Sequence, residues 1–509
     1  MKTKILLRTL ATLAVAALLA LPAAAQEVDF ITYVSIGDSL TMGIMDACLV
    51  EHGQRDSYPA IIARQAGRPF EQPLVKEHGL GGCMYLKSLL SATGALDPVF
   101  GNWPSDGVPL NATLPRPYNN LGIDGFKIHD VVATNPTTPQ ASAAYLTLRG
   151  QGTALQQAAS MRPTFVTIWI GANEFYPAIT SATAIECPDP RVPGCTLTSM
   201  SSVNADLDTI FNTLKTAQGG TAKGVVLNMA DPLIPFITTV SPVLGTNPAN
   251  GQPIYALSNV GCPTGVPVCP VPAGSYLTLV AGQYLKAGYG VPCAILAPTD
   301  PKQANCNKPL PDNFSVNPST GAISPGVVLT PPEFAAIRLK AQQINEALQA
   351  KATAAGYKIF DMVAWWNDLR TNGRSYGALA LSTNYLGGIV SYDGAHLTST
   401  GYAILANDLI EFINANYGNE IPQADMYPFL FNGNTSPGGY PPPPLAGAAL
   451  APGDEIIWAA AAFTPETWYE NLKSIFPDLN QHRAVSADPD GEPVSTGREA
   501  PRRKSDRIN

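Results

Sequence analysis

Four short apolar runs, rich in β-branched and aromatic residues, constrain the fold of this chain more than any other feature. Their hydrophobic residues are nearly continuous rather than alternating, which is typical of strands buried on both faces of a sheet. The runs span residues 30–37, 164–171, 224–229 and 357–363. The chain therefore favours a central sheet that is covered on both sides.

Segments with helix-compatible spacing lie between and after these runs. They span residues 144–161, 203–217 and 333–355, and an apolar stripe follows at Leu405, Leu409, Phe412 and Ile413. Strands that alternate with helices predict an α/β fold with a parallel sheet between two helical layers. In such sheets, ligands bind beyond the carboxyl ends of the strands.

The first 25 residues have the pattern of a cleaved secretory signal peptide. Lys2, Lys4 and Arg8 precede an apolar stretch over residues 10–21, and three alanines at 23–25 form a small-residue cleavage site. The stretch is shorter than the roughly 20 residues that a membrane span needs. The alternative is an uncleaved N-terminal anchor. We expect cleavage, and a protein that is secreted or periplasmic.

The remaining composition is that of a globular protein with a lightly charged, acidic surface. Charged residues make up 14% of the chain and the net charge is −8. Binding to nucleic acids needs clustered Lys and Arg, whereas this chain has a net negative charge, so we expect no nucleic-acid partner. No later segment is apolar enough to predict a stable membrane span. The oligomeric state is not predicted by any pattern that we find.

Three segments are predicted after the signal peptide. A large domain spans residues 26–432 and contains an insertion, at about 231–330, that is rich in Pro, Gly, Thr and Asn. We expect this insertion to be a loop region fixed by disulfides on the ligand-binding face of the sheet. Residues 433–509 have the composition of a Pro-rich linker followed by a largely disordered tail.

An even number of cysteines in an exported chain suggests disulfide bonds. Sequence alone leaves many pairings open, and we expect neighbours along the chain to pair. A zinc site is the competing hypothesis, but no Cys-x-x-Cys or close Cys/His grouping favours it. The expected pairs are Cys48 with Cys83, Cys187 with Cys195, Cys262 with Cys269, and Cys293 with Cys306.

Ser39 directly follows the first apolar run, in the tetrapeptide Gly37-Asp38-Ser39-Leu40. A serine hydroxyl at the carboxyl end of a strand lies where ligands bind, and it becomes a nucleophile when a base removes its proton. The same residues are also typical of an ordinary helix cap. The tetrapeptide alone therefore does not decide between a nucleophile and a helix cap.

Asp393 and His396 are the best-spaced candidates for such a base and its orienting carboxylate. They lie three residues apart in a loop that leads into a helix, an arrangement found at no other histidine of the chain. A carboxylate on one imidazole nitrogen holds the tautomer that lets the other nitrogen accept a proton. The alternative is a turn that only begins the following helix.

Four segments, taken together, resemble the conserved blocks of the SGNH hydrolases, also called GDSL esterases and lipases. They occur in the family's order and the resemblance covers roughly residues 30–415 apart from the insertion. The segments are Gly37-Asp38-Ser39-Leu40, residues 120–125 with the sequence NLGIDG, residues 171–174 with the sequence GANE, and residues 393–398 with the sequence DGAHLT.

This resemblance implies a three-layer α/β/α sandwich with a five-stranded parallel sheet of flavodoxin-like order. It implies ester hydrolysis through an acyl-enzyme, with Ser39 as nucleophile, His396 as base and Asp393 as the residue that orients it. The oxyanion-hole donors would be Gly125, Asn173 and the backbone N–H of Ser39, without a metal or cofactor. The sequence departs from the family at Glu174, where Asp is usual.

Several functional alternatives remain open at this point. A phospholipase or a polysaccharide deacetylase would use the same residues on a different small-molecule or lipid ester, and a catalytically silent secreted binding protein would keep only the fold. Residues 373–377 also match the G-x-S-x-G elbow of α/β-hydrolases around Ser375. That elbow needs a strand before it, and the residues before Ser375 are not strand-like.

Overall fold

The structure is a computed structural model. It describes residues 27–432, apart from 77, 91–95, 140–141, 188–191, 193, 230–241, 312–314, 317–322, 325, 378 and 384–386. The predicted signal peptide and the predicted linker and tail at 433–509 lie outside the described residues. Among the described helices, none combines the length and the apolar character that crossing a membrane would need.

A five-stranded parallel sheet forms the centre of the molecule. Its strands are β1 (Tyr33–Gly37), β4 (Asn120–Gly122), β5 (Phe165–Trp169), β8 (Gly224–Leu227) and β17 (Lys358–Phe360). They lie in the order β17-β8-β5-β1-β4, and each neighbouring pair is parallel. Counted along the chain this order is 2-1-3-4-5, the flavodoxin-like doubly wound arrangement. The predicted α/β class and parallel sheet are confirmed.

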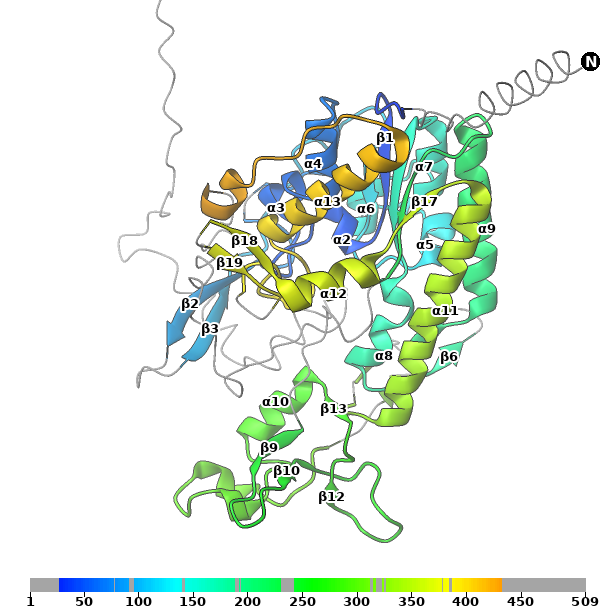
Figure 1. Cartoon of the computed structure of the whole chain (residues 1–509). Coiled ribbons are helices and arrows are strands. Elements are labelled where there is room, and N and C mark those ends of the chain that lie inside the picture. The colour runs from blue at the N-terminus through cyan, green and yellow to red at the C-terminus, as the bar shows by residue number, and fades with distance from the viewer. Residues whose placement is uncertain are drawn as a thin grey trace, which may run out of the picture.

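Helices lie on both sides of this sheet, an arrangement compatible with a three-layer sandwich (Figure 1). On one side α4 (Tyr58–Gln65) packs against α13 (Ser399–Tyr417). The other side holds α5 (Ile128–Ala133), α7 (Ala154–Ser160), α9 (Met200–Ala217) and α11 (Pro331–Ala355). The other described α-helices outside the insertion are α2 (Ser39–Met42), α3 (Glu51–Arg55), α6 (Ala143–Leu148), α8 (Tyr176–Thr180) and α12 (Met362–Asn372).

Local signals explain where the helices begin and end. Helix α11 starts at a capping box, in which the side chains of Thr330 and Glu333 each accept a hydrogen bond from the other residue's backbone N–H. The helix ends at Gly356, which is in the left-handed region. The single helix predicted over residues 144–161 is wrong. Arg149 adopts a φ of 53° and is followed by glycines, so the chain leaves the helical conformation and begins α7 anew after Thr153.

Two glycines let the short helix α2 lie directly on the sheet. A Cβ atom at Gly37 would stand 2.1 Å from the Thr41 Oγ1 atom and 2.4 Å from the carbonyl oxygen of Trp169. A Cβ at Gly122 would stand 2.5 Å from the backbone nitrogen of Met42. Any side chain at either position would therefore force α2 away from β1 and β4, and Ser39 with it.

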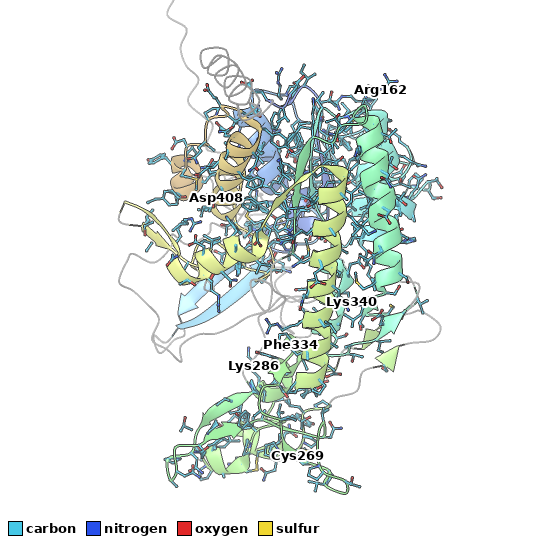
Figure 2. The ribbon with its side chains drawn as sticks, turned by 45° about the vertical axis from the view of Figure 1, so that its right-hand side comes forward. Arg162, Cys269, Lys286, Phe334, Lys340 and Asp408 are labelled. Carbon is cyan, nitrogen blue, oxygen red and sulfur yellow. A yellow bond between two sulfur atoms is a disulfide. The ribbon has the colours of Figure 1, made fainter. Side chains whose placement is uncertain are left out.

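The predicted insertion follows the carboxyl end of β8 and lies below the sheet in Figure 1. Its described parts are α10 (Leu279–Lys286) and short strands around a small core of their own. Tyr276 of the insertion packs against Phe334 of α11, with ring centroids 5.1 Å apart. Figure 2 shows Phe334 on the part of α11 next to the insertion. The paired strands are β9 (Val243–Thr246), β10 (Pro253–Tyr255), β11 (Leu257–Ser258), β12 (Cys269–Pro270), β13 (Tyr276–Leu277), β14 (Ser315–Val316), β15 (Ile323–Ser324) and β16 (Val328–Leu329).

Three smaller strand pairs lie outside both the central sheet and the insertion. The hairpin of β2 (Met84–Leu90) and β3 (Leu96–Asn102) projects to one side of the domain (Figure 1). Strands β6 (Glu186–Cys187) and β7 (Leu197–Thr198) are parallel, and β18 (Arg374–Tyr376) pairs with β19 (Leu379–Leu381) in antiparallel fashion. The first residue of β2, Met84, donates its backbone N–H to Asp46, just after α2, and Thr198 of β7 donates its hydroxyl to Glu174.

Three of the four expected disulfides are present, and one is not. Cys48 bonds to Cys83, and the insertion contains Cys262–Cys269 and Cys293–Cys306. Cys187 and Cys195 are buried free thiols. The bond expected between them is therefore wrong for this structure, in which the Cys195 thiol donates a hydrogen bond to the carbonyl oxygen of Leu197, 3.2 Å away. Burial, aided by the neighbouring Cys187, raises the pKa of Cys195 to about 12, so this thiol stays protonated.

Candidate active site

Ser39 is the first residue of α2, two positions beyond the end of β1, and only 1% of its surface is exposed. The helix cap is supplied by Asp38, whose carboxylate accepts a hydrogen bond from the Leu40 backbone N–H at 3.0 Å. Asp38 therefore acts as the helix cap that was considered as the alternative function of Gly37-Asp38-Ser39-Leu40. Helix capping does not account for Ser39, which begins the helix at the edge of the sheet where ligands bind in this fold class.

Asp393 and His396 form a buried hydrogen-bonded pair. The His396 Nδ1 atom lies 2.8 Å from the Asp393 Oδ2 atom, and both side chains are at most 3% exposed. The other carboxylate oxygen, Oδ1, accepts hydrogen bonds from the backbone N–H groups of Ala395 and His396, each at 2.8 Å. The turn considered as an alternative is thus present, and it also holds the carboxylate against the imidazole.

The two groups shift each other's pKa in opposite directions. Burial alone would raise the pKa of Asp393, but the His396 charge and hydrogen bonds from His396 and Ala395 outweigh it and lower the pKa to about 2. Burial alone would lower the pKa of His396, but the Asp393 charge and hydrogen bond outweigh it and raise it. Asp393 therefore remains ionised and stabilises an imidazolium when one forms.

The segments after β1 and β4 both approach His396. The charge of Asp38, next to Ser39, and the charge of Asp124, next to Gly125, each contribute to raising the pKa of the imidazole. The hydroxyl of Tyr402, on α13, donates to the carbonyl oxygen of Ile44, 2.9 Å away, which joins the chain after α2 to the helix after His396. Three of the four motif segments are thereby brought to one place.

Gly125 and Asn173 lie on the loops that follow the two strands flanking β1. Gly125 has a φ of 74°, a conformation that favours glycine, and it is partly exposed. Asn173 is 3% exposed, and its Nδ2 atom donates to the Phe126 carbonyl oxygen at 2.9 Å. An amide nitrogen carries two hydrogens, so this bond leaves Asn173 a second N–H to donate. Strands β4, β1 and β5 are adjacent, so the three expected oxyanion donors come from neighbouring strand ends.

Glu174, the departure from the family pattern, has a definite structural role. Its fully buried carboxylate accepts hydrogen bonds from the Ile128 backbone N–H, at 2.6 Å, and from the Thr198 hydroxyl. Burial raises its pKa. The longer side chain connects the Asn173 loop to the first residue of α5 and to β7, and no pattern in the sequence identifies these two partners.

Sequence reasoning also missed two residues that contact the loop of Asp393 and His396. Asp46 and Ala47 lie just after α2, and Ala47 donates its backbone N–H to the Asp393 Oδ2 atom at 2.7 Å. Neither residue belongs to a recognisable motif. An Asp at a turn position was the only available signal, and it is common in loops of every kind.

The competing serine, Ser375, lies in a different environment. It is exposed in the short antiparallel strand β18, which follows helix α12 and turns back into β19. A nucleophile elbow requires the opposite order, a strand before the serine and a helix after it. Rejecting Ser375 on sequence grounds agrees with this structure.

No family model, no curated protein and no solved structure matches the chain. Among the described residues, no group of three or more His, Cys, Asp and Glu side chains is placed to hold a metal ion.

Proposed function

We propose that this protein is a serine hydrolase of the SGNH type that cleaves carboxylic esters through an acyl-enzyme on Ser39. The observation that carries the proposal is the buried Asp393–His396 pair, with Nδ1 and Oδ2 2.8 Å apart. A buried imidazole held in this way is suited to accept a proton on its other nitrogen. The loop that carries the pair contacts the chain just after α2, the helix that begins with Ser39, through the Ala47 N–H and the Asp393 Oδ2 atom.

In the proposed reaction the Ser39 hydroxyl attacks the ester carbonyl carbon while the His396 Nε2 atom takes its proton. The tetrahedral intermediate collapses, and His396 gives the proton to the leaving alcohol. Water then attacks the acyl-enzyme with His396 again as base, which releases the acid and restores Ser39. Gly125, Asn173 and the Ser39 backbone N–H would stabilise the negative carbonyl oxygen.

The position of these groups in the sheet also supports the proposal. Strand β1 lies where the strand order reverses, with β4 on one side and β5 on the other. Ligands in open α/β sheets bind at this switch point, beyond the carboxyl ends of the strands. Ser39 and Asn173 follow β1 and β5, the strands on either side of the switch point, and Gly125 follows β4, the other neighbour of β1.

The class of ester is the least constrained part of the proposal. Short-chain esters, phospholipids and acylated polysaccharides would all use the same catalytic groups. The insertion that follows β8 begins at the carboxyl edge of the sheet, which makes it a candidate wall of the substrate pocket. We further propose export as the cellular route, since the three disulfides suit an oxidising compartment.

Labelling and kinetics with Ser39→Ala test the proposal. A fluorophosphonate probe should label the wild-type protein at Ser39, and turnover of a chain-length series of acyl esters should disappear in Ser39→Ala. Ser375→Ala is the matched control, because Ser375 lies in an exposed hairpin. A Ser39→Ala protein that still hydrolyses the esters would overturn the assignment, and an unlabelled, inactive wild type would favour a binding protein.

A further inference from the structure

A two-residue turn directly after the candidate nucleophile helix has an unusual backbone. Met45 and Cys48 exchange both backbone hydrogen bonds, at 3.2 and 3.1 Å, and close a tight hairpin around Asp46 and Ala47. Both central residues have positive φ, 52° for Asp46 and 63° for Ala47. Turns with this backbone normally contain Asn-Gly or Asp-Gly, because a Cβ is unfavourable there. An alanine held in this conformation indicates that surrounding contacts fix the turn.

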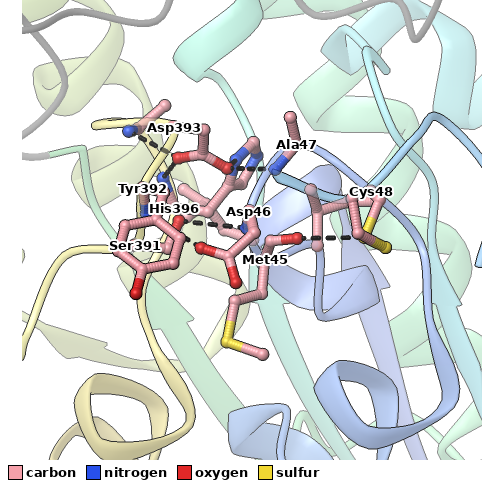
Figure 3. A network of polar contacts seen from close by, with 12 residues as sticks. Met45, Asp46, Ala47, Cys48, Ser391, Tyr392, Asp393 and His396 are labelled. Carbon is pink, nitrogen blue, oxygen red and sulfur yellow. Dashed lines mark hydrogen bonds and ion pairs between the residues drawn. A yellow bond between two sulfur atoms is a disulfide. The ribbon is translucent and has the colours of Figure 1, made fainter. Parts of the chain in front are cut away.

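This 45–48 turn makes three hydrogen bonds to the loop that carries Asp393 (Figure 3). The Ala47 backbone N–H donates to the Asp393 Oδ2 atom at 2.7 Å, the same oxygen that faces the His396 Nδ1 atom. The Asp46 N–H donates to the Ser391 hydroxyl oxygen at 3.2 Å. In the other direction, the Tyr392 backbone N–H donates to the Asp46 Oδ1 atom at 2.9 Å.

The far side of the turn is attached to the base of the β2–β3 hairpin. Cys48 forms a disulfide with Cys83, and the Met84 backbone N–H donates to the Asp46 carbonyl oxygen at 2.9 Å. The Leu49 and Leu80 backbones exchange hydrogen bonds next to it, at 2.9 and 2.8 Å. The turn is therefore fixed on one side by a covalent bond and contacts the catalytic loop on the other.

We propose that the 45–48 turn orients Asp393, and through it His396, with Asp46 as a positioning residue and the Cys48–Cys83 disulfide as its attachment. This inference deepens the proposed function, since it assumes that Asp393 and His396 are catalytic. Asp393 accepts four hydrogen bonds, and the one from Ala47 is the only one of them that comes from outside residues 393–396. The Ala47 N–H therefore fixes the carboxylate relative to α2 and Ser39.

The consequence appears at His396. Its pKa is raised by Asp393, with smaller contributions from Asp124 and Asp38, against the effect of burial. A carboxylate that rotates away from the imidazole raises the pKa of His396 less. Loss of the contacts from the 45–48 turn should therefore lower the pKa of His396. Misorientation should also slow the chemical step, by about 10- to 100-fold in kcat, with little change in KM.

Two variants of Asp46 separate a positioning role from a charge effect. Asp46→Ala removes the acceptor for the Tyr392 N–H, while Asp46→Asn removes the charge and keeps an acceptor oxygen. We expect Asp46→Ala to lower kcat and to move both the His396 titration, followed by NMR of labelled histidine, and the acidic limb of the kcat/KM profile to lower pH. Asp46→Asn should keep kcat and the His396 titration close to their wild-type values. Equal shifts in the two variants would overturn the positioning role.

The disulfide provides a second, independent test. The double variant Cys48→Ser/Cys83→Ser should shift the His396 titration in the same direction as Asp46→Ala, whereas Cys262→Ser/Cys269→Ser, in the insertion, should leave it unmoved. An unchanged His396 titration in both Asp46→Ala and Cys48→Ser/Cys83→Ser would overturn the proposal. The NMR titration needs no turnover, so it distinguishes this failure from a wild type that hydrolyses no ester, which would instead refute the proposed function.

Discussion

The Asn173 side-chain amide donates a hydrogen bond to the Phe126 carbonyl oxygen, 2.9 Å away, and so joins the loops that follow β5 and β4. Gly125, the other expected oxyanion donor outside Ser39, directly precedes Phe126. The two donors are therefore held at a fixed separation. Such preorganisation is what lets hydrogen-bond donors stabilise a developing oxyanion without rearranging during the reaction.

Replacing Asn173 with alanine removes this link together with one of the proposed oxyanion donors. We expect Asn173→Ala to lower kcat by about 10²- to 10³-fold with little change in KM, because the donor acts on the transition state. Steady-state kinetics on a short-chain ester measures both constants. A variant that changes KM alone would assign Asn173 to substrate binding instead.

Asp393→Asn tests the orientation of the base. An asparagine keeps the size of the side chain, but it can present an N–H to His396 and so favour the wrong imidazole tautomer. We expect kcat to fall by about 10²- to 10⁴-fold while fluorophosphonate labelling of Ser39 becomes slow rather than absent. Activity near that of the wild type would show that Asp393 does not orient the base.

Glu174 gives a prediction about stability, because its carboxylate satisfies the buried Ile128 N–H and the Thr198 hydroxyl. Glu174→Ala leaves both groups without this acceptor, and each buried unpaired group costs about 1–3 kcal/mol. We expect a clearly lower melting temperature for Glu174→Ala and a smaller loss for Glu174→Gln, which keeps one acceptor oxygen. Thermal unfolding followed by circular dichroism measures the melting temperatures of both variants. Equal decreases in the two variants would contradict the role of Glu174 as a hydrogen-bond acceptor.

Much of the fold could be predicted because its signals are local. Continuous apolar runs marked four of the five central strands, helix-compatible spacing marked α9, and good helix formers marked α11. The fifth strand, β4, has only three residues and gave no such signal of its own. The helix predicted over 144–161 failed where Arg149 takes a left-handed conformation, which side-chain periodicity does not encode.

The candidate site was predicted as separate residues rather than as a network. Motif spacing identified Ser39, Asp393 and His396, but hydrogen bonds between distant segments leave no pattern in the sequence. The contact from Ala47 to Asp393 spans 346 positions and uses a backbone N–H, which every residue except proline has. Spacing also failed for Cys187 and Cys195, which were expected to bond and are free thiols in this structure.

Asp38 is a buried carboxyl group whose ionisation should make stability depend on pH. It is 1% exposed, and burial raises its pKa from 3.8 to about 7, although the Leu40 N–H and the His396 charge act in the opposite direction. The folded protein therefore binds this proton more tightly than the unfolded chain does. Its contribution to stability is full below about pH 4 and is lost as the pH rises through about 7.

Asp38→Asn removes this titration and keeps an oxygen that can cap α2, since asparagine is as good an N-cap as aspartate. We expect the variant to be more stable than the wild type at pH 8, by up to a few kcal/mol, and to differ little from it at pH 4. Urea unfolding at the two pH values measures the difference. A variant that gains nothing at pH 8 relative to pH 4 would show that the Asp38 carboxylate is not destabilised by burial.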